Sequence, residues 1–201
     1  MSPTIGVLAI QGDVREHINH INALDVVARP VKTRADLQNL HGLIIPGGES
    51  TTMSILAKRN DLFPMLRKLS NEIPMFGSCA GLIMLANTVT DGREDQETIG
   101  GINIVAQRNA FGRQVDSFEI DLDIRQIGEP VFPAVFIRAP LVSAVGEGVE
   151  VLATIPAETF GDEHDRVVAV RQGNLMATSF HPEITNDFRI HQYFVEMVKA
   201  A

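Results

Sequence analysis

The sequence contains a single cysteine, Cys79, in the segment "PMFGSCAGLIML" at residues 74–85. A lone cysteine is most often a small buried apolar residue. Here, however, an apolar run leads into the turn "GSCAG", and an apolar run of helical character follows it. A G-x-C-x-G turn between a strand and a helix is the thiol version of the nucleophile elbow. The N-terminus of the following helix also favours thiolate over thiol. We therefore expect Cys79 to be a nucleophile.

A nucleophilic thiol needs a general base, and the base needs an orienting group. The segment "SFHPEIT" offers both after an apolar strand, because His181 is followed two residues later by Glu183. If the backbone stays extended here, the two side chains point to the same side and the carboxylate can hold the imidazole. An H-x-E pair alone is a weak signal. In a chain with an elbow cysteine, it predicts a triad of Cys79, His181 and Glu183.

The third chemical element is the Gly-Gly turn in "LIIPGGEST" at residues 43–51, which follows a predicted strand. An ordinary tight turn and a phosphate-binding loop are both alternatives. The segment lacks the lysine of G-x-x-x-x-G-K-[ST] and the spacing of G-x-G-x-x-G, which argues against nucleotide phosphate. Backbone N–H groups beside a nucleophile can instead form an oxyanion hole. The candidate donors are the N–H groups of Gly48 and Ala80.

Two further histidines, His17 and His20, have the H-x-x-H spacing of metal ligands. No third ligand is apparent, so we expect no metal site and place both on a solvated helix face that is available to a partner. Tyr193 and Phe194, on the last predicted helix, are interpreted as packing residues.

Composition narrows the class of protein. With 201 residues, of which 45% are hydrophobic, the chain can bury the core of one domain spanning 1–201. A formal charge of −8 argues against binding to nucleic acid or anionic membrane. The sequence has no apolar run of membrane-spanning length and no secretory signal pattern. A single cysteine excludes an internal disulfide framework, which fits a cytoplasmic location.

The elements that must position these residues follow from the apolar patterning. In the first half, short apolar runs alternate with helical patterns, which predicts a parallel sheet with helices on both faces. The expected strands are "TIGVLAI", "VVARPV", "GLIIP" and "IPMFGS", and the expected helices are "VREHINHINAL", "STTMSILAKR" and "AGLIMLANTV". In the second half, "SFEIDLDI" alternates as a half-solvated strand in an antiparallel part of the sheet. Further strands are expected at "VFPAVFI", "VEVLATI", "RVVAV" and "NLMATSF", before a last helix, "DFRIHQYFVEMVKA". The fold class is α/β, with an open, mixed, mostly parallel sheet in three layers. The polar segment 90–98 is expected to be an exposed loop, and no role is assigned to 158–165.

The motifs "FGSCAG", "PGGES" and "SFHPE" resemble those of the class I (triad) glutamine amidotransferases. "LAIQGDVREH", "PGGESTTM", "RNAFGRQVDSF" and "VFIRAP" are similar to one branch, the glutaminase subunits of pyridoxal 5′-phosphate synthases of the deoxyxylulose 5-phosphate-independent vitamin B6 pathway. These motifs lie between residues 5 and 183, nearly the whole chain. The resemblance implies the flavodoxin-like sheet of this class.

The resemblance also implies roles for individual residues. Cys79 would attack the side-chain amide of L-glutamine and form a thioester. His181, oriented by Glu183, would protonate the leaving ammonia and then activate water. Glutamine binding would fall on Gly48, Glu49, Ser50, Arg108, Ile137 and Arg138. We expect Glu49 to receive the ammonium and Arg108 the carboxylate, in place of a surface salt bridge for either arginine.

No cofactor is expected. The implied partner is a (β/α)8-barrel synthase subunit in a large hetero-oligomer, to which the ammonia is passed. Gln11 and Gly12 match a segment near the oxyanion hole and the subunit interface of such complexes.

Three alternatives remain open from the sequence. One is a stand-alone cysteine hydrolase, such as a γ-glutamyl peptidase, which needs no partner. Another is a non-catalytic binding protein with an idle thiol, against which the presence of both His181 and Glu183 argues. The third is the amidotransferase subunit of imidazole glycerol phosphate synthesis. "GGESTTM" and "RNAFGRQ" favour the vitamin B6 branch.

Overall fold

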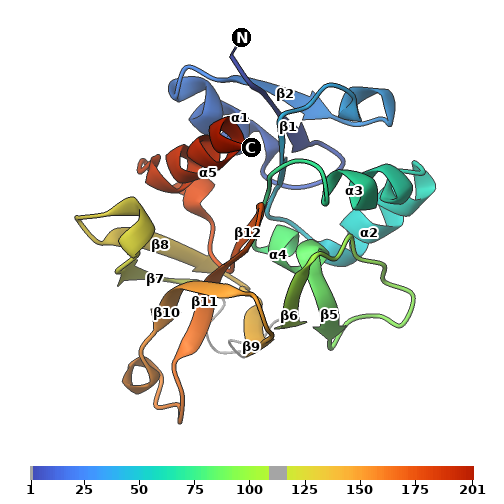
Figure 1. Cartoon of the computed structure of the whole chain (residues 1–201). Coiled ribbons are helices and arrows are strands. Elements are labelled where there is room, and N and C mark those ends of the chain that lie inside the picture. The colour runs from blue at the N-terminus through green and yellow to red at the C-terminus, as the bar shows by residue number, and fades with distance from the viewer. Residues whose placement is uncertain (1, 109–116) are drawn as a thin grey trace.

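The computed structural model describes residues 2–108 and 117–201, and most of its elements follow the predicted alternation (Figure 1). The helices are α1 (Val14–Ala23), α2 (Ser50–Arg59), α3 (Phe63–Leu69), α4 (Ala80–Leu85) and α5 (Arg189–Ala200). The strands are β1 (Thr4–Leu8), β2 (Val27–Val31), β3 (Gly42–Ile45), β4 (Met75–Ser78), β5 (Ala86–Thr90), β6 (Ile102–Gln107), β7 (Ser117–Leu122), β8 (Phe132–Ile137), β9 (Leu141–Val145), β10 (Glu150–Ile155), β11 (Arg166–Gln172) and β12 (Leu175–Thr178).

The main sheet has the strand order β2-β1-β3-β4-β12-β11-β9-β6-β5, with β10 paired to β11. Its first half is parallel from β2 through β12, as predicted. Beyond β12 the pairs with β11 and β9 are antiparallel, and the sheet ends in the parallel pair of β6 and β5. The fold is therefore a mixed α/β sheet with helices on its faces.

The helices divide between the two faces, with α1 and α5 together on one side and α2, α3 and α4 on the other (Figure 1). Alternate residues of the parallel strands supply two separate apolar cores, because successive side chains of a strand point to opposite faces. On β3, Leu43 and Ile45 pack toward the core of α2, α3 and α4, whereas Ile44 packs toward that of α1 and α5. Met75 and Phe76 divide in the same way on β4.

Two predicted elements differ from the structure. The segment "SFEIDLDI" does form an antiparallel strand, but β7 pairs with β8 in a separate two-stranded sheet. Phe118 of β7 stacks on Phe136 of β8 with ring centroids 4.5 Å apart, and Phe136 is buried in the same core as Phe180. The helix predicted over "AGLIMLANTV" ends at Leu85, and the next residues form β5. The β-branched residues of "NTVT" explain the change, since they favour a strand beside β6.

The parallel strands β1, β3, β4 and β12 all end at the same edge of the sheet. Ligand sites of open α/β sheets form at this edge, beyond the carboxyl ends of the strands. The segments that follow these four strands carry Gln11, Gly48, Cys79 and His181, respectively. Within residues 2–108 and 117–201, none of the helices combines the length and apolarity that a membrane crossing requires.

Candidate active site

Cys79 lies at the turn between β4 and α4 with φ of 49° and ψ of −102°. A positive φ is strained for a residue other than glycine, and such strain clusters at functional sites. The two flanking glycines make the turn possible: a Cβ atom on Gly77 would lie 2.4 Å from the backbone of Gly81, and one on Gly81 would lie 2.1 Å from the carbonyl oxygen of Ile45. The local sequence therefore builds the predicted elbow and places Cys79 at its apex.

His181 lies in the same pocket as Cys79 and contacts Glu183, but not through the extended backbone expected from H-x-E. A short 3₁₀ turn, η4 (Pro182–Ile184), follows His181. The turn brings the His181 Nδ1 atom to 2.8 Å from Oε1 of Glu183. The Glu183 side chain is completely buried. The imidazole is therefore held by a carboxylate that water does not reach.

Asp13 is a second carboxylate at His181 that the sequence analysis did not identify. Asp13 stands at the beginning of α1, and its Oδ2 atom lies 3.5 Å from Nδ1 of His181. Ligand atoms of Asp13, His181 and Glu183 lie within 4.8 Å of one another. Both carboxylates lie beside the same ring nitrogen of His181, Nδ1, so both can stabilise a charged imidazole. The signal for Asp13 was present, because Asp13 follows β1 at the same sheet edge as Cys79.

These contacts change the protonation of His181. Burial alone would lower its pKa, since it disfavours the charged ring. Contacts with Asp13, Cys79 and Glu183 outweigh that effect and raise the pKa of His181 well above its ordinary value. The interaction is mutual, because the contact with His181 lowers the pKa of Asp13. These contacts therefore favour the protonated, imidazolium form of His181.

A pocket of about 380 Å³ opens over Cys79. This volume lies within the range of about 300–1,000 Å³ of small-molecule sites. Ten of the twelve residues expected at the site line it, namely Gln11, Gly48, Glu49, Ser50, Cys79, Ala80, Arg108, Ile137, Arg138 and His181. Four residues that were not expected complete the lining: Asp13, Ile83, Pro140 and Ile184. The sequence-based set thus converges on one cavity.

The other two expected residues lie just outside the pocket. Glu183 lies behind His181. Gly12 contacts the Gly-Gly turn so closely that a Cβ atom would lie 1.8 Å from the carbonyl oxygen of Gly47. With φ of 98°, Gly12 also has a conformation that favours glycine. Its place in the structure is that of a packing residue under the turn.

The side chain of Arg108 does not point freely into the pocket. Its Nη2 donates to Oε1 of Glu49 at 2.8 Å, and its Nη1 donates to Oε1 of Gln96 at 3.2 Å. Glu49 also accepts hydrogen bonds from the N–H groups of Thr51 and Thr52, so its side chain caps the N-terminus of α2. Hydrogen bonds to Thr52 and Thr51 lower the pKa of Glu49 to about 2, although burial opposes this shift. The two residues expected to bind the two charged ends of an amino acid therefore bind each other here.

Gln96 corrects the expectation for the polar segment 90–98. Most of this segment is exposed, but Gln96 is partly buried. It donates to Oγ of Ser50 at 3.2 Å and contacts Thr51 as well as Arg108. Through Gln96, the polar loop therefore holds two residues of the pocket wall, Ser50 and Arg108.

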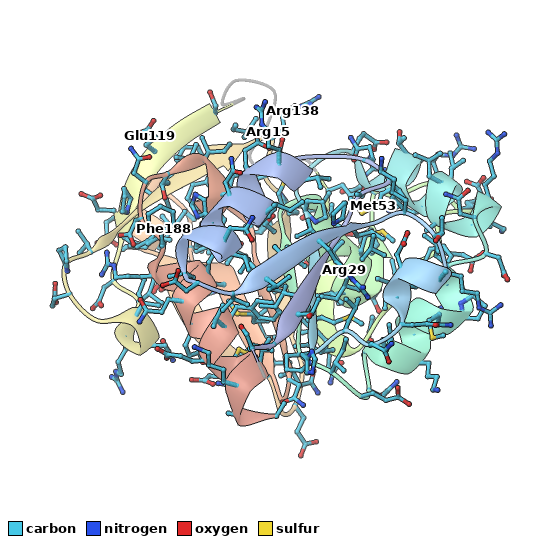
Figure 2. The ribbon with its side chains drawn as sticks, turned by 90° about the horizontal axis from the view of Figure 1, so that it is seen from above. Arg15, Arg29, Met53, Glu119, Arg138 and Phe188 are labelled. Atoms are coloured by element: carbon cyan, nitrogen blue, oxygen red, sulfur yellow. The ribbon has the colours of Figure 1, made fainter. Side chains whose placement is uncertain are left out.

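Ile137 and Arg138 bring the β7–β8 hairpin to the nucleophile. The Cys79 Sγ atom lies 3.9 Å from the carbonyl oxygen of Ile137. Arg138 has a positive φ of 43°, a second strained residue at the site. In the view of Figure 2, Arg138 lies at the same edge of the molecule as Arg15 of α1.

The expectation that His17 and His20 lie on a solvated helix face is wrong. His17 is fully buried and His20 is 6% exposed. The reason is tertiary: α1 packs against α5, where His191 offers a polar partner to both rings. The other packing expectations hold, because Phe194 is buried and Tyr193 packs against the same core.

Comparison with known proteins adds the family. The model of the SNO glutamine amidotransferase family matches residues 7–200. The chain belongs to this family. The membership agrees with the resemblance carried by the cysteine, glycine and histidine motifs. It disfavours both the stand-alone hydrolase and the non-catalytic alternative.

Relatives narrow the branch within this family. A protein of a Nocardioides species named "Pyridoxal 5′-phosphate synthase subunit PdxT" is 54% identical over 198 residues, which cover 98% of this chain and 96% of the relative. A protein of the same name from Salinispora arenicola is 53% identical, with 100% and 98% covered. A solved structure titled "Crystal structure of glutamine amidotransferase" superposes with a TM-score of 0.87 at 45% identity, covering 97% of this chain and 98% of that one. The vitamin B6 branch is therefore confirmed over the imidazole glycerol phosphate branch.

Proposed function

We propose that this protein hydrolyses L-glutamine to L-glutamate and ammonia, and that the ammonia serves pyridoxal 5′-phosphate synthesis. The observation that carries the proposal is the position of Cys79. The only cysteine of the chain stands at a strained turn, in a pocket shared with a histidine that a buried carboxylate holds. A glutaminase that forms a covalent intermediate needs a nucleophile, a base beside it and a third group that orients the base.

In the first half-reaction, the Cys79 thiolate attacks the amide carbon of glutamine. The tetrahedral oxyanion is stabilised by backbone N–H groups, for which Gly48 and Ala80 at the pocket wall are the candidates. The C–N bond breaks, and His181 gives its proton to the leaving nitrogen, so that ammonia departs and a thioester remains. The raised pKa of His181 keeps the ring protonated in the free site, so a proton is present when the leaving nitrogen needs it.

In the second half-reaction, His181 has become a neutral base and takes a proton from water. The resulting hydroxide attacks the thioester, glutamate leaves, and the thiolate of Cys79 and the imidazolium of His181 are restored. Glu183 keeps the His181 ring in one orientation through both steps.

We propose that five pocket residues bind glutamine, namely Glu49, Ser50, Arg108, Ile137 and Arg138. Because Arg108 and Glu49 pair with each other in the free site, glutamine must compete with this ion pair or insert beside it. The carboxylate of glutamine would replace Glu49 at the Arg108 guanidinium, and the ammonium would take the freed carboxylate of Glu49.

The partner proposal is a (β/α)8-barrel synthase subunit, joined in a large hetero-oligomer. The relatives are named as subunits, which supports a complex. The Oε1 atom of Gln11 accepts the N–H of Glu49 at 2.9 Å, so a partner that binds near Gln11 would act directly on the oxyanion turn. We further propose a cytoplasmic setting, since the single nucleophilic thiol must stay reduced. Residues 1–201 are proposed to form one glutaminase domain, because β12, near the end of the chain, lies between β4 and β11.

The decisive test is ammonia release from L-glutamine, measured with and without the barrel synthase subunit. We expect release that depends on Cys79 and rises strongly with the synthase. Absence of release with the synthase present would contradict the proposal. Equal release without the synthase would favour the stand-alone hydrolase.

A further inference from the structure

A chain of buried polar groups runs from the triad carboxylate along the contact between α1 and α5. The Oγ atom of Ser78 lies 3.0 Å from Nε2 of His17 and 3.5 Å from Oε1 of Glu183. The Nδ1 atom of His17 lies 2.9 Å from Nε2 of His191, and Nδ1 of His191 lies 3.1 Å from Nδ1 of His20. These residues come from α1, β4, the η4 turn and α5, so only the fold connects them.

At one end of this chain, one carboxylate oxygen of Glu183 lacks a hydrogen-bond donor among the described residues. The Oε1 atom of Glu183 is bound by His181, but its Oε2 atom is buried and makes no hydrogen bond to any described residue. A buried carboxylate oxygen without a donor is costly. The Nε2 atom of His17 lies 3.5 Å from this oxygen. His17 is therefore placed to supply a donor to the second oxygen of Glu183.

Only one direction of hydrogen bonding along the chain supplies a donor to Glu183. If His17 carries its proton on Nε2, it donates toward Ser78 and Glu183, and the Ser78 hydroxyl is free to donate to Glu183 as well. The Nδ1 atom of His17 is then an acceptor, which requires a proton on Nε2 of His191. His191 then accepts at Nδ1 from a protonated Nδ1 of His20. In the reverse direction, the Ser78 hydroxyl donates to His17 and both donors to Glu183 are lost.

The surroundings favour neutral rings in the middle of the chain. Burial lowers the pKa of His17 and, more strongly, that of His191. The groups that face the chain are Glu183, Asp13 and His181 at the site end, and Asp187 and the backbone of Thr185 at His20. Burial lowers the pKa of His20 as well, and Glu183, Thr185 and Asp187 oppose that shift. The rings of Phe76 and Phe188 enclose the two ends, with Phe188 labelled in Figure 2.

We propose that His17 is a positioning residue for the triad, which holds Glu183 together with Ser78 while His191 and His20 fix the tautomer that makes His17 a donor. This inference rests on the proposed glutaminase function. His17 does not line the substrate pocket, so its effect reaches the substrate only through Glu183 and His181. A packing histidine, by contrast, would affect stability and leave turnover by folded molecules unchanged.

The kinetic test compares His17→Leu with His17→Gln in the presence of saturating synthase subunit. Active sites are counted by labelling Cys79, so that unfolded molecules do not enter the rate. A lost hydrogen bond to a charged group predicts that His17→Leu lowers kcat by about 10- to 100-fold, with KM for glutamine nearly unchanged. The glutamine side chain can place an amide N–H near the position of Nε2, so His17→Gln should retain most of the kcat. His41→Leu is the matched control, because His41 is an exposed histidine that accepts a bond from the N–H of Thr4.

The second test reads the tautomer in the unsubstituted protein by ¹⁵N–¹H correlation of the histidine rings. We expect His17 and His191 to be neutral with the proton on Nε2. A proton on Nδ1 of His17 alone would overturn the proposal, and so would a kcat per labelled site in His17→Leu equal to that of the wild type. If the wild-type protein lacks glutaminase activity with the synthase, the proposed function fails instead, and the tautomer measurement still decides the direction of the chain.

Discussion

The guanidinium of Arg108 donates to the carboxylate of Glu49 at the wall of the pocket, with Nη2 and Oε1 2.8 Å apart. The side chain of Arg108 is 17% exposed and that of Glu49 is 44% exposed, so the pair is reachable by a ligand. Both charges that an amino-acid substrate needs are thus held at the site, but in contact with each other. Glutamine binding then becomes an exchange of partners, and both residues should control KM more than kcat.

Arg108→Ala should raise KM for glutamine by about 10- to 100-fold, because charge-assisted hydrogen bonds contribute about 1.5–3 kcal/mol. The kcat should change little. Steady-state ammonia release at varied glutamine measures both constants. Arg34→Ala is the control, since Arg34 forms an exposed ion pair with Asp61 and should leave KM unchanged. An unchanged KM in Arg108→Ala would make Arg108 a structural partner of Glu49 alone.

Cys79 should be the site of covalent labelling by a glutamine-mimicking electrophile such as diazo-norleucine. The expected stoichiometry is one label per chain, and excess glutamine should slow the reaction. Mass spectrometry of the digested protein locates the label. Cys79→Ala should take up no label and release no ammonia. A label at another residue, or activity in Cys79→Ala, would remove Cys79 from the mechanism.

His181 and Glu183 should act as one unit, since they share a hydrogen bond of 2.8 Å. His181→Ala should lower kcat on the order of 10⁶-fold, by analogy with other catalytic triads. Adding Glu183→Gln should then cost little more, because members of a triad are not additive. The measurement is the double-mutant cycle in kcat. Losses that multiply would mean that the two residues act separately.

Turnover should depend on the synthase partner. One hydrogen bond fixes the present orientation of the Gly47–Gly48 peptide: the carbonyl oxygen of Gly47 accepts the N–H of Asp13 at 3.1 Å. Glycine allows this peptide to turn easily, and Gly48 has φ of 152°. We expect the free protein to keep the Gly48 N–H turned away from the oxyanion position, and the partner to favour the turned-in state.

Two observations check this gate. Ammonia release by the protein alone should be near background, and the synthase should stimulate it strongly even without sugar phosphate. Gln11→Ala should weaken the stimulation, because Gln11 holds the N–H of Glu49 next to the turn. Equal rates with and without the synthase would show that no gate exists.

The stability of the fold should depend on the charge of Glu49. Its pKa is about 2 in the folded protein, below the ordinary value of 4.5. A lowered pKa means that the ionised group stabilises the fold above pH 4.5, and that this contribution is lost as the pH falls through 4.5 toward 2. Glu49→Gln should therefore unfold more easily than the wild type at pH 7, by up to about 1 kcal/mol for a weakened helix cap. The difference should shrink near pH 3.

Urea unfolding at pH 7 and pH 3 measures this effect. Glu119→Gln provides the control, because Glu119 is an exposed residue of β7 and lies in Figure 2 on the opposite side from Met53 of α2, the helix that Glu49 caps. A difference for Glu49→Gln that does not change with pH would mean that packing, and not charge, explains its stability.

Much of this protein follows from local sequence. The alternation of apolar runs predicted the strands β1 to β4 as a parallel sheet and the helices α1 and α2, because strand and helix periods are properties of neighbouring residues. The elbow at Cys79 was predictable for the same reason, since the glycines that its tight turn requires stand beside it in the chain. The glutamine-binding residues of the pocket were predicted through the family resemblance, because it assigns motifs that are distant in the chain to one site.

Other features were decided only by the tertiary structure. The helical pattern of α1 did not reveal that His17 faces inward, because its partners Ser78 and His191 are supplied by β4 and α5. Asp13 became part of the site through the convergence of parallel strand ends. Arg108 and Glu49 lie 59 residues apart and meet only when the sheet is complete. Hydrogen bonds and ion pairs of this kind depend on distances of a few ångströms between separate elements, and no period or spacing along the chain encodes them.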